Sequence, residues 1–532
     1  MSININRCNS ESGAVLPMLL SIIIALAIFI AAAEELVLSN LSLVGRNNDS
    51  QKALNIAEAG INYYLWHLSH DGTDYKDGRT TPATPDPNLG YGPYQHNYID
   101  DNANTTGTYT LWIKPQGSGS TVVTVRAIGK VSNSSATRTI EARIGAPSFA
   151  SYDVLADTAL WFGNTEATSG PIHSNQGIRM DGASADNITS ARATYVPPSS
   201  LGGDGSTSHN GVWCSPSVTS PVNCNTRSKS DWSFPVAAVD FNQVSGSLCT
   251  IKKVAFLSDP ATASLASNNS TACSQVPAQR TPAYLPQRSS NGSFNVSRGY
   301  LIQLNSDGSY NLYNVNGEND RLTPYTSALT LQLVATNVAV PSSGVIFAED
   351  NVWVRTNPTF HGKVTIGAGR LQSSNVNANI VIADDVLYST KNGSDAIGLI
   401  AEDDVIVAPY APPSSGSFNF EVDAALIAQS GSVNYPLNYR TNNNACTRGW
   451  TSTNQNFTFY GSLSSRQTWT WTWLVGNSSC GDAVRDSTNE YISGISHNTT
   501  QYDYNLQYSP PPSFPVTSTY NILSWREVLT RP

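Results

Sequence analysis

The sequence predicts a long N-terminal helix with a small antiparallel sheet (α+β), followed by a larger, mainly-β domain. Three features predict this: an uncharged apolar run near the N-terminus, a helical apolar pattern that continues it, and later segments with alternating or β-branched residues. The chain has 532 residues, more than one hydrophobic core usually supports, so several structural units are expected.

The composition is that of a surface-exposed, β-rich protein. Only 13% of the residues are charged, the formal net charge is -9, and Ser, Thr, Asn and Gly are abundant. Binding to a phosphate backbone needs clustered Lys and Arg, which an acidic balance does not favour. Nucleic acid is therefore not an expected partner.

Residues 14–33 form the apolar run AVLPMLLSIIIALAIFIAAA, which contains no charge. A helix of about 20 residues rises about 30 Å, the thickness of the hydrocarbon core of a membrane. A buried soluble helix and a cleavable secretory signal are the alternatives. The run is long for a signal, and its helical pattern continues beyond Ala33. We therefore expect residues 14–33 to span a membrane.

An amphipathic helix is expected to extend this span. Its apolar face is formed at spacings of three and four by Leu54, Ala57, Ile61, Leu65 and Leu68. Gly45 and the polar stretch 47–50 are expected to interrupt the helix and to kink it.

A family resemblance rests on three features: a polar leader ending in Glu11-Ser12-Gly13, the apolar helix, and the segment A-L-N-I-A-E-A-G at residues 53–60. Over residues 7–146 the chain resembles the PilX-like family of minor type IV pilins. The resemblance implies that residues 1–13 are a leader, that a prepilin peptidase cuts between Gly13 and Ala14, and that the helix packs against those of other pilins.

Met18 is the main departure from the pilin pattern. Most pilins carry a glutamate at the fifth mature position, which here is Met18. In the family that glutamate is thought to pair with the N-terminal amine of a neighbouring subunit inside the helix bundle. A tip pseudopilin of type II secretion systems also lacks it, so the resemblance implies a tip or initiating position.

Residues 34–146 are expected to combine the amphipathic helix with a sheet. After a turn-rich stretch come three β-like runs, YTLWIKP, TVVTVRAIGKV and TRTIEARIG, at residues 109–115, 121–131 and 137–145. Arg7 precedes the apolar run and Glu34 and Glu35 follow it, which predicts a single-pass cell-membrane protein whose C-terminal part is extracellular, on a pilus or the cell surface.

Six cysteines follow the leader, an even number that agrees with an extracellular location. They are Cys214, Cys224, Cys249, Cys273, Cys446 and Cys480. The simplest of the fifteen possible connectivities joins each cysteine to its neighbour in the sequence. No C-x-x-C pair or nearby His favours the alternative of a metal site.

Residues 147–532 contain an irregular repeat of a strand, a small residue, a polar corner and a second strand. Its copies centre on Ala156, Ala348, Ala383, Ala401 and Ala428, and the segment 170–182 looks like a further copy. The repeat predicts a parallel β-helix or solenoid, with a β-sandwich as the alternative. This segment and the ending of the chain resemble large surface domains attached to PilX-like pilins.

Acidic residues recur at the predicted corners. They are Glu349, Asp350, Asp384, Asp385, Glu402, Asp403 and Asp404. Stacked in register, they could bind Ca²⁺ or act as general acid and base on a glycan. The simpler interpretation places them at solvent-facing turns, where Asp is favourable. We therefore predict no cofactor, with Ca²⁺ as the one candidate.

No motif for nucleophilic or phosphate chemistry was found, and His173 and His361 are interpreted as structural. Trp469, Trp471 and Trp473 alternate in T-W-T-W-T-W and could form one face of a strand. Such a face could bind sugar rings or a protein partner. The alternative is that it covers the end of the solenoid.

Together these features predict a minor pilin or pilus-tip component rather than an enzyme. Its expected partners are other pilins, the membrane, and a host-cell or surface glycan or protein. The alternative is a membrane-anchored, polysaccharide-acting β-helix enzyme of the cell surface.

Overall fold

The computed structural model describes residues 15–70, 74–100, 102–115, 122–163, 166–215, 231–288, 298–319, 325–372, 376–411, 418–436, 455–474, 484–485, 491–495, 497–517 and 520–529. The chain forms two compact units. Unit 1 consists of Met1–Lys114, Thr124–Arg143 and Ile522–Pro532; unit 2 consists of Pro115–Val123 and Ile144–Asn521. The sequence places the whole of 147–532 in one β domain, whereas the last strand belongs to unit 1.

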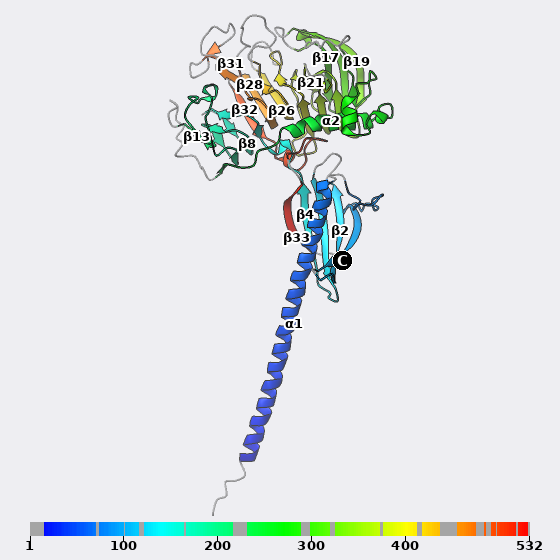
Figure 1. Ribbon diagram of the computed structural model, residues 1–532, viewed down its shortest axis with the longest axis vertical. Helices are drawn as coiled ribbons and strands as arrows, with labels where there is room; N and C mark the ends of the chain where they lie inside the picture. Colours follow the sequence, from blue (N-terminus) through cyan, green and yellow to red (C-terminus); the bar gives the residue numbers. More distant parts are fainter. Residues whose placement is uncertain are drawn as a thin grey trace, which may run out of the picture. The chain divides into compact units, whose positions relative to one another are not determined.

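Unit 1 combines one long helix with a five-stranded sheet (Figure 1). The helix is α1 (Val15–His70). The strands lie in the order β1 (Tyr91–Ile99), β2 (Thr105–Pro115), β3 (Val122–Val131), β4 (Thr137–Gly145) and β33 (Asn521–Val528). The three strands predicted from sequence correspond to β2, β3 and β4. The strands β1 and β33 were not predicted.

The helix α1 runs without interruption through Gly45, so the predicted break at residues 45–50 was wrong. Its buried face consists of Ala53, Ile56, Ala57, Gly60, Ile61, Tyr64 and Leu68. The predicted face shared Ala57, Ile61 and Leu68 with it, whereas Leu54 and Leu65 are only half-buried. The helix approaches the sheet closely at Gly129 of β3, where a Cβ would lie 2.1 Å from the Ala53 carbonyl oxygen.

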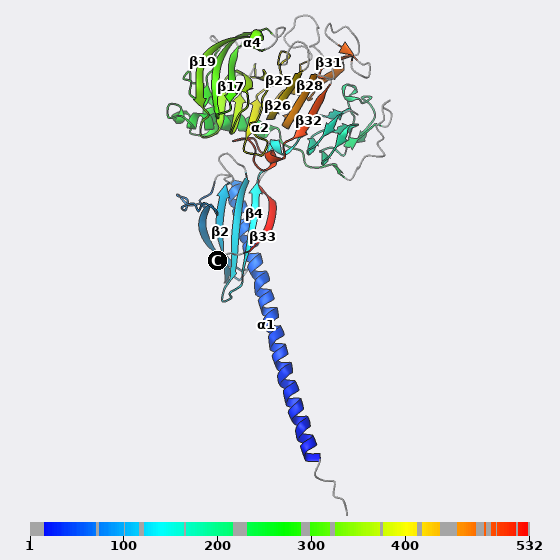
Figure 2. The same ribbon diagram turned by 180° about the vertical axis from the view of Figure 1, so that it is seen from behind.

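Unit 2 is built mainly from parallel strands in two large sheets. The 11-stranded sheet contains β16 (Tyr284–Leu285), β20 (Val345–Ala348), β22 (Lys363–Ala368), β24 (Ala396–Ala401), β26 (Phe418–Ala428), β28 (Gln455–Ser465), β5 (Val154–Ala156), β8 (Ile172–Ser174), β11 (Ile188–Ser190) and β15 (Trp232–Ser233) in that order, and β32 (Asn498–Tyr502) pairs with β28. Figure 2 shows β26, β28 and β32 side by side.

The second large sheet has seven strands. They are β19 (Leu329–Ala339), β18 (Ser309–Glu318), β17 (Gly299–Asn305), β21 (Asn351–Asn357), β23 (Ile380–Ile382), β25 (Val405–Val407) and β27 (Val433–Asn434). From β17 to β27 all pairings are parallel, and β17, β18 and β19 pair antiparallel. Between β20 and β28 the chain therefore alternates between the two sheets. This parallel pairing differs from that of the antiparallel β-sandwich considered as the alternative.

The order of the strands in the 11-stranded sheet is not the order of the sequence. Strands β16 to β28 are stacked in chain order, and then β5 pairs with β28 in parallel. The early segment 154–233 thus extends the stack beyond residue 465. The shorter strands β6 (Leu160–Phe162), β9 (Ile178–Met180) and β14 (Val212–Trp213) pair in a separate parallel sheet.

Two hydrophobic cores lie on opposite faces of the 11-stranded sheet. In β20, Ile346 and Ala348 belong to the core shared with the seven-stranded sheet, while Val345 and Phe347 belong to the other. This alternation follows from the two-residue period of a strand. The second core is covered by α2 (Asn242–Leu257), whose buried side chains include Leu248 and Ile251. The helix α2 was not predicted from the sequence.

Candidate functional site

The N-terminal part of α1 is an exposed apolar surface. Every side chain from Val15 to Val44 is exposed, and the large apolar ones are Val15, Leu16, Met18, Leu19, Leu20, Ile22, Ile23, Ile24, Leu26, Ile28, Phe29, Ile30, Leu36, Val37, Leu38, Leu41, Leu43 and Val44. Soluble monomers rarely expose an apolar patch of this size. The uncharged stretch 15–33 therefore needs an apolar partner, either lipid or other apolar helices.

This segment meets the requirements of an apolar environment. The helix is long and apolar enough to cross a membrane, and none of its most apolar window is buried within the chain. The Ser21 hydroxyl donates a hydrogen bond to the Met18 carbonyl oxygen at 2.8 Å, so this polar group needs no outside partner. Met18 is 66% exposed, and its thioether carries no charge. Gly13 and Ala14 lie outside the described residues.

The recurring acids of unit 2 do not line a common open face. Glu349, Asp350 and Glu402 are 2%, 1% and 8% exposed, so placing them at solvent-facing turns was wrong. Most of these carboxylates accept hydrogen bonds from backbone amides: Asp350 from Arg288, Asp385 from Glu421, Glu402 from Arg370 and Ala378, and Asp404 from Ser432. Asp384 pairs with Arg355 at 3.4 Å, and Asp403 accepts from the Ser430 hydroxyl.

Side-chain oxygens also connect successive turns of the chain beside the seven-stranded sheet. Asn351 Oδ1 accepts from the Asn379 amide at 2.9 Å, Asn379 Oδ1 accepts from the Asp404 amide at 3.0 Å, and Asp404 Oδ1 accepts from the Ser432 amide at 2.6 Å. We call Asn351, Asn379, Asp404 and Ser432 the corner ladder. Its side chains satisfy backbone groups at a chain reversal, which is a structural role.

Among the described residues, no three His, Cys, Asp or Glu side chains come together in a way that could hold a metal ion such as Ca²⁺. His173 is buried, with Nδ1 2.9 Å from Thr189 Oγ1 and Nε2 3.1 Å from Asn175 Oδ1. His361 lies 2.9 Å from Asp395 at an exposed turn. The contacts of His173 and His361 join neighbouring side chains of the fold, which is a structural role.

One polar cluster was not predicted from sequence. Lys391 Nζ lies 2.6 Å from Glu421 and 2.8 Å from Asp423, and 4.3 Å from the centre of the Tyr460 ring. The Tyr460 hydroxyl donates to Asp503 at 2.9 Å. Burial raises the pKa of Asp423 to about 6, against the opposing effect of Lys391. Asp423 also accepts from the Tyr388 amide, so its oxygens are already engaged within the fold.

The tryptophans do not form an exposed strip. Trp471 is 4% exposed and its ring packs against Phe457 at 5.1 Å between centroids. Trp469 is half-buried and packs against Phe162, and Trp473 donates its indole N–H to the Tyr435 carbonyl at 2.8 Å. The strand β29 (Thr472–Leu474) begins only after Trp471. The prediction of an adhesive aromatic face therefore fails for Trp471, which belongs to the core.

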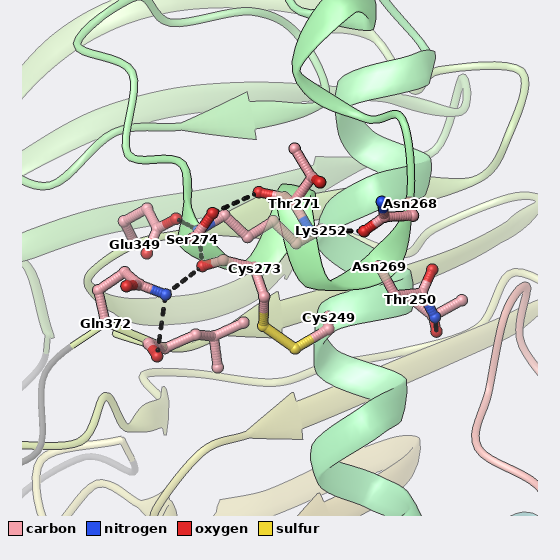
Figure 3. The surroundings of a disulfide bond; sticks show 11 residues. Cys249, Thr250, Lys252, Asn268, Asn269, Thr271, Cys273, Ser274, Glu349 and Gln372 are labelled. Atoms are coloured by element: carbon pink, nitrogen blue, oxygen red, sulfur yellow. Dashed lines mark hydrogen bonds and ion pairs between the residues drawn. A yellow bond between two sulfur atoms is a disulfide. The ribbon is translucent and has the colours of Figure 1, made fainter.

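Cys249 and Cys273 form a disulfide, which is the pairing that sequence proximity predicts. It joins α2 to α3 (Asn269–Ser274), as Figure 3 shows. Cys214 is also disulfide-bonded. Cys224, Cys446 and Cys480 lie outside the described residues.

Comparison with known proteins gives little support for any assignment. No family profile matches the chain, and no curated protein sequence matches it. Among solved structures, the crystal structure of the competence-associated pilin ComZ from Thermus thermophilus aligns over 91% of this chain and 98% of that chain. The sequence identity is 13% and the TM-score is 0.26, which is too low to establish a common fold.

Proposed function

We propose that the chain is a minor pilin-like subunit whose apolar helix inserts into a membrane and then into a bundle of similar helices. The observation that carries this proposal is the division of α1. Its first part, residues 15–44, is fully exposed, and the stretch 15–33 within it is apolar and uncharged, while the last part of the helix packs against the sheet of unit 1. A helix that is anchored at one end and uncovered at the other is suited to helix-to-helix assembly.

Processing between Gly13 and Ala14 is part of this proposal. It would place Met18 at the fifth position of the mature chain. A methionine there cannot pair with the amine of a neighbouring subunit, whereas a buried carboxylate could. This supports a tip or initiating position, where one end of the subunit has no neighbour to bind.

We further propose that unit 2 is a parallel β-helix displayed on the cell surface or pilus for adhesion to a surface or cell. The alternation of the chain between two parallel sheets supports this fold. The internal bonds of the acidic residues favour a binding or mechanical role over catalysis. The polysaccharide-acting enzyme is the alternative; the oxygens of Asp423 in the Lys391 cluster are bound within the fold, which weighs against it.

The test is the N-terminal sequence of the protein recovered from sheared surface filaments. The wild-type chain is expected to start at Ala14. A Gly13→Val variant is expected to keep its leader and to be absent from the filament fraction. Ser12→Ala is the matched control and should be processed normally. A wild-type chain that still begins at Met1, or a wild-type protein that is absent from the filaments, would contradict the pilin proposal.

A further inference from the structure

A lysine and a glutamate are buried together beneath α2. The proposed function assigns no role to either residue. Lys252 lies on α2 and Glu349 directly follows β20. The two side chains are 0% and 2% exposed, and Lys252 Nζ contacts Glu349 Oε1. Figure 3 shows this pair close to the Cys249–Cys273 disulfide.

The surroundings of the pair are mostly apolar. Lys252 Nζ lies 5.8 Å from the centre of the Phe256 ring and 5.7 Å from that of Phe347. Besides its contact with Glu349, Nζ donates a hydrogen bond to the Cys273 carbonyl at 3.2 Å, and the Tyr284 hydroxyl donates to Glu349 Oε1 at 3.3 Å. These contacts hold the amine of Lys252 in a fixed position against the carboxyl group of Glu349. The hydrogen bond from Tyr284 polarises the carboxyl group at Oε1.

Burial disfavours the charged form of both partners. It lowers the pKa of Lys252 and raises the pKa of Glu349 to about 7, and in each case the opposite charge of the partner acts against the shift. Transfer of one proton from the ammonium to the carboxylate gives a neutral amine beside a neutral carboxylic acid. A desolvated lysine amine is a nucleophile, and the protonated carboxylic acid, unlike the carboxylate, can serve as its acyl donor.

We propose that Lys252 and Glu349 condense to an intramolecular amide that joins α2 covalently to the end of β20. The Nζ lone pair attacks Cδ of Glu349, so that an Nζ–Cδ bond forms and one Cδ–O bond breaks. The departing hydroxyl takes one amine proton and leaves as water. No electron is gained or lost, and no co-reactant is needed. Because the two groups are held together, much of the entropic part of the activation barrier for this step is already paid.

The amide would complete a covalent staple over the second core. The disulfide joins α2 to α3, and the amide would join α2 to the sheet on which it packs. Cross-links of this kind stabilise a fold mainly by restricting the unfolded chain. Unlike the disulfide, the amide would survive reduction. This inference does not depend on the proposed pilin function.

The test is mass spectrometry of the full chain, extracted from membranes in detergent, reduced, alkylated and digested with trypsin. The amide predicts a single species in which Ser230–Lys253 is joined to Leu322–Arg355, lighter than the two peptides together by one water. A digest without reduction, in which Cys249 is linked to Cys273, shows that the chain was folded. Cleavage after Lys252 and a free Leu322–Arg355 peptide from such folded protein would overturn the proposal.

Three variants sharpen the test. In Lys252→Arg the guanidinium keeps its charge and is not acylated by Glu349, so the two peptides should separate. Lys253→Arg, one residue along, is the matched control and should retain the joined species. Tyr284→Phe should slow the appearance of the joined species after synthesis without changing the disulfide, because it removes only the hydrogen bond to Glu349. If Lys252→Arg does not fold, the wild-type digest still decides.

Discussion

Arg138 on β4 forms a two-pronged ion pair with Glu527 on β33, although 389 residues separate them in the chain. Arg526, the residue before Glu527, also pairs with β4, because its Nε and Nη2 both donate to Glu141 Oε1. All four residues belong to unit 1. The chain therefore leaves unit 1 after β4, forms unit 2, and returns to add a last strand to the sheet that it left.

Reversing one charge of the Arg138–Glu527 pair is expected to loosen β33. Arg138→Glu or Glu527→Arg alone places like charges together and should weaken the attachment of β33, although modestly, because the pair is partly exposed. Amide hydrogen exchange in residues 521–528 should then become faster. The double variant restores opposite charges and should return exchange to the wild-type rate. Equal rates in the double and single variants would rule out this pairing.

Much of unit 1 could be predicted because its patterns are local. The apolar run and the spacing of Ala57, Ile61 and Leu68 depend only on the period of a helix. The continuity of α1 through Gly45 was missed, because a single glycine costs a helix only about 1 kcal/mol and neighbouring turns can compensate. The strand β33 was missed because its partner is remote in the sequence.

In unit 2 the repeat was largely in the right register. The residues Ala348, Ala368, Ala401, Ala428, Ser465, Ala156, Ser174 and Ser190 form one column of the 11-stranded sheet. Four of the five predicted centres lie in this column. Ala383 does not, because it follows β23 in the other sheet. Ala368 and Ser465 were not among the predicted centres. They are followed by Gly369 and Arg466, whereas Ala348 and Ala401 are followed by acidic residues.

The position of the early segment could not be predicted, since β5 pairs with β28 through contacts that no local pattern encodes. The Lys252–Glu349 pair was missed for a similar reason. The glutamate was noted as a corner acid, but its partner lies on an unpredicted helix. Burial of both groups becomes visible only when α2 is placed on the sheet.

Gly129→Ala is expected to destabilise unit 1 strongly. A Cβ at residue 129 would lie 2.1 Å from the Ala53 carbonyl oxygen and 2.5 Å from the Ala57 amide nitrogen, so α1 would have to move away from β3. Overpacking of this kind costs about 1–3 kcal/mol. Gly45→Ala is the matched control. A Cβ at residue 45 would have nothing within 4 Å outside the neighbouring turns of the helix. The Gly45→Ala substitution should therefore stabilise the helix by up to about 1 kcal/mol. Thermal unfolding of the full chain in detergent measures both, and equal effects would contradict the close approach.

Asn351→Ala is expected to destabilise unit 2, because it removes the first acceptor of the corner ladder. The Asn379 amide then loses its partner at 2.9 Å, and Asn351 is fully buried. A buried unsatisfied donor costs about 1–3 kcal/mol. Asn456→Ala, on the exposed side of β28, is the control and should change stability by less than about 0.5 kcal/mol. Denaturant unfolding of the full chain compares the two. Similar small losses would mean that the ladder contributes little.

Asp153→Asn is expected to remove a pH dependence of stability. Asp153 is fully buried, and burial raises its pKa from 3.8 to about 6, although Oδ2 accepts from the Ser169 and Gly170 amides. Between about pH 4 and pH 6 the folded chain keeps a proton that the unfolded chain releases. The contribution of Asp153 to stability is therefore present at low pH and lost as the pH rises, by about 3 kcal/mol in all.

The asparagine keeps a carbonyl oxygen for the two amides but does not ionise. The melting temperature of the variant relative to wild type should therefore rise from pH 4 to pH 7. Other buried acids titrate in both proteins and cancel in this comparison. A difference between Asp153→Asn and wild type that stays constant with pH would mean that folding does not raise the pKa of Asp153.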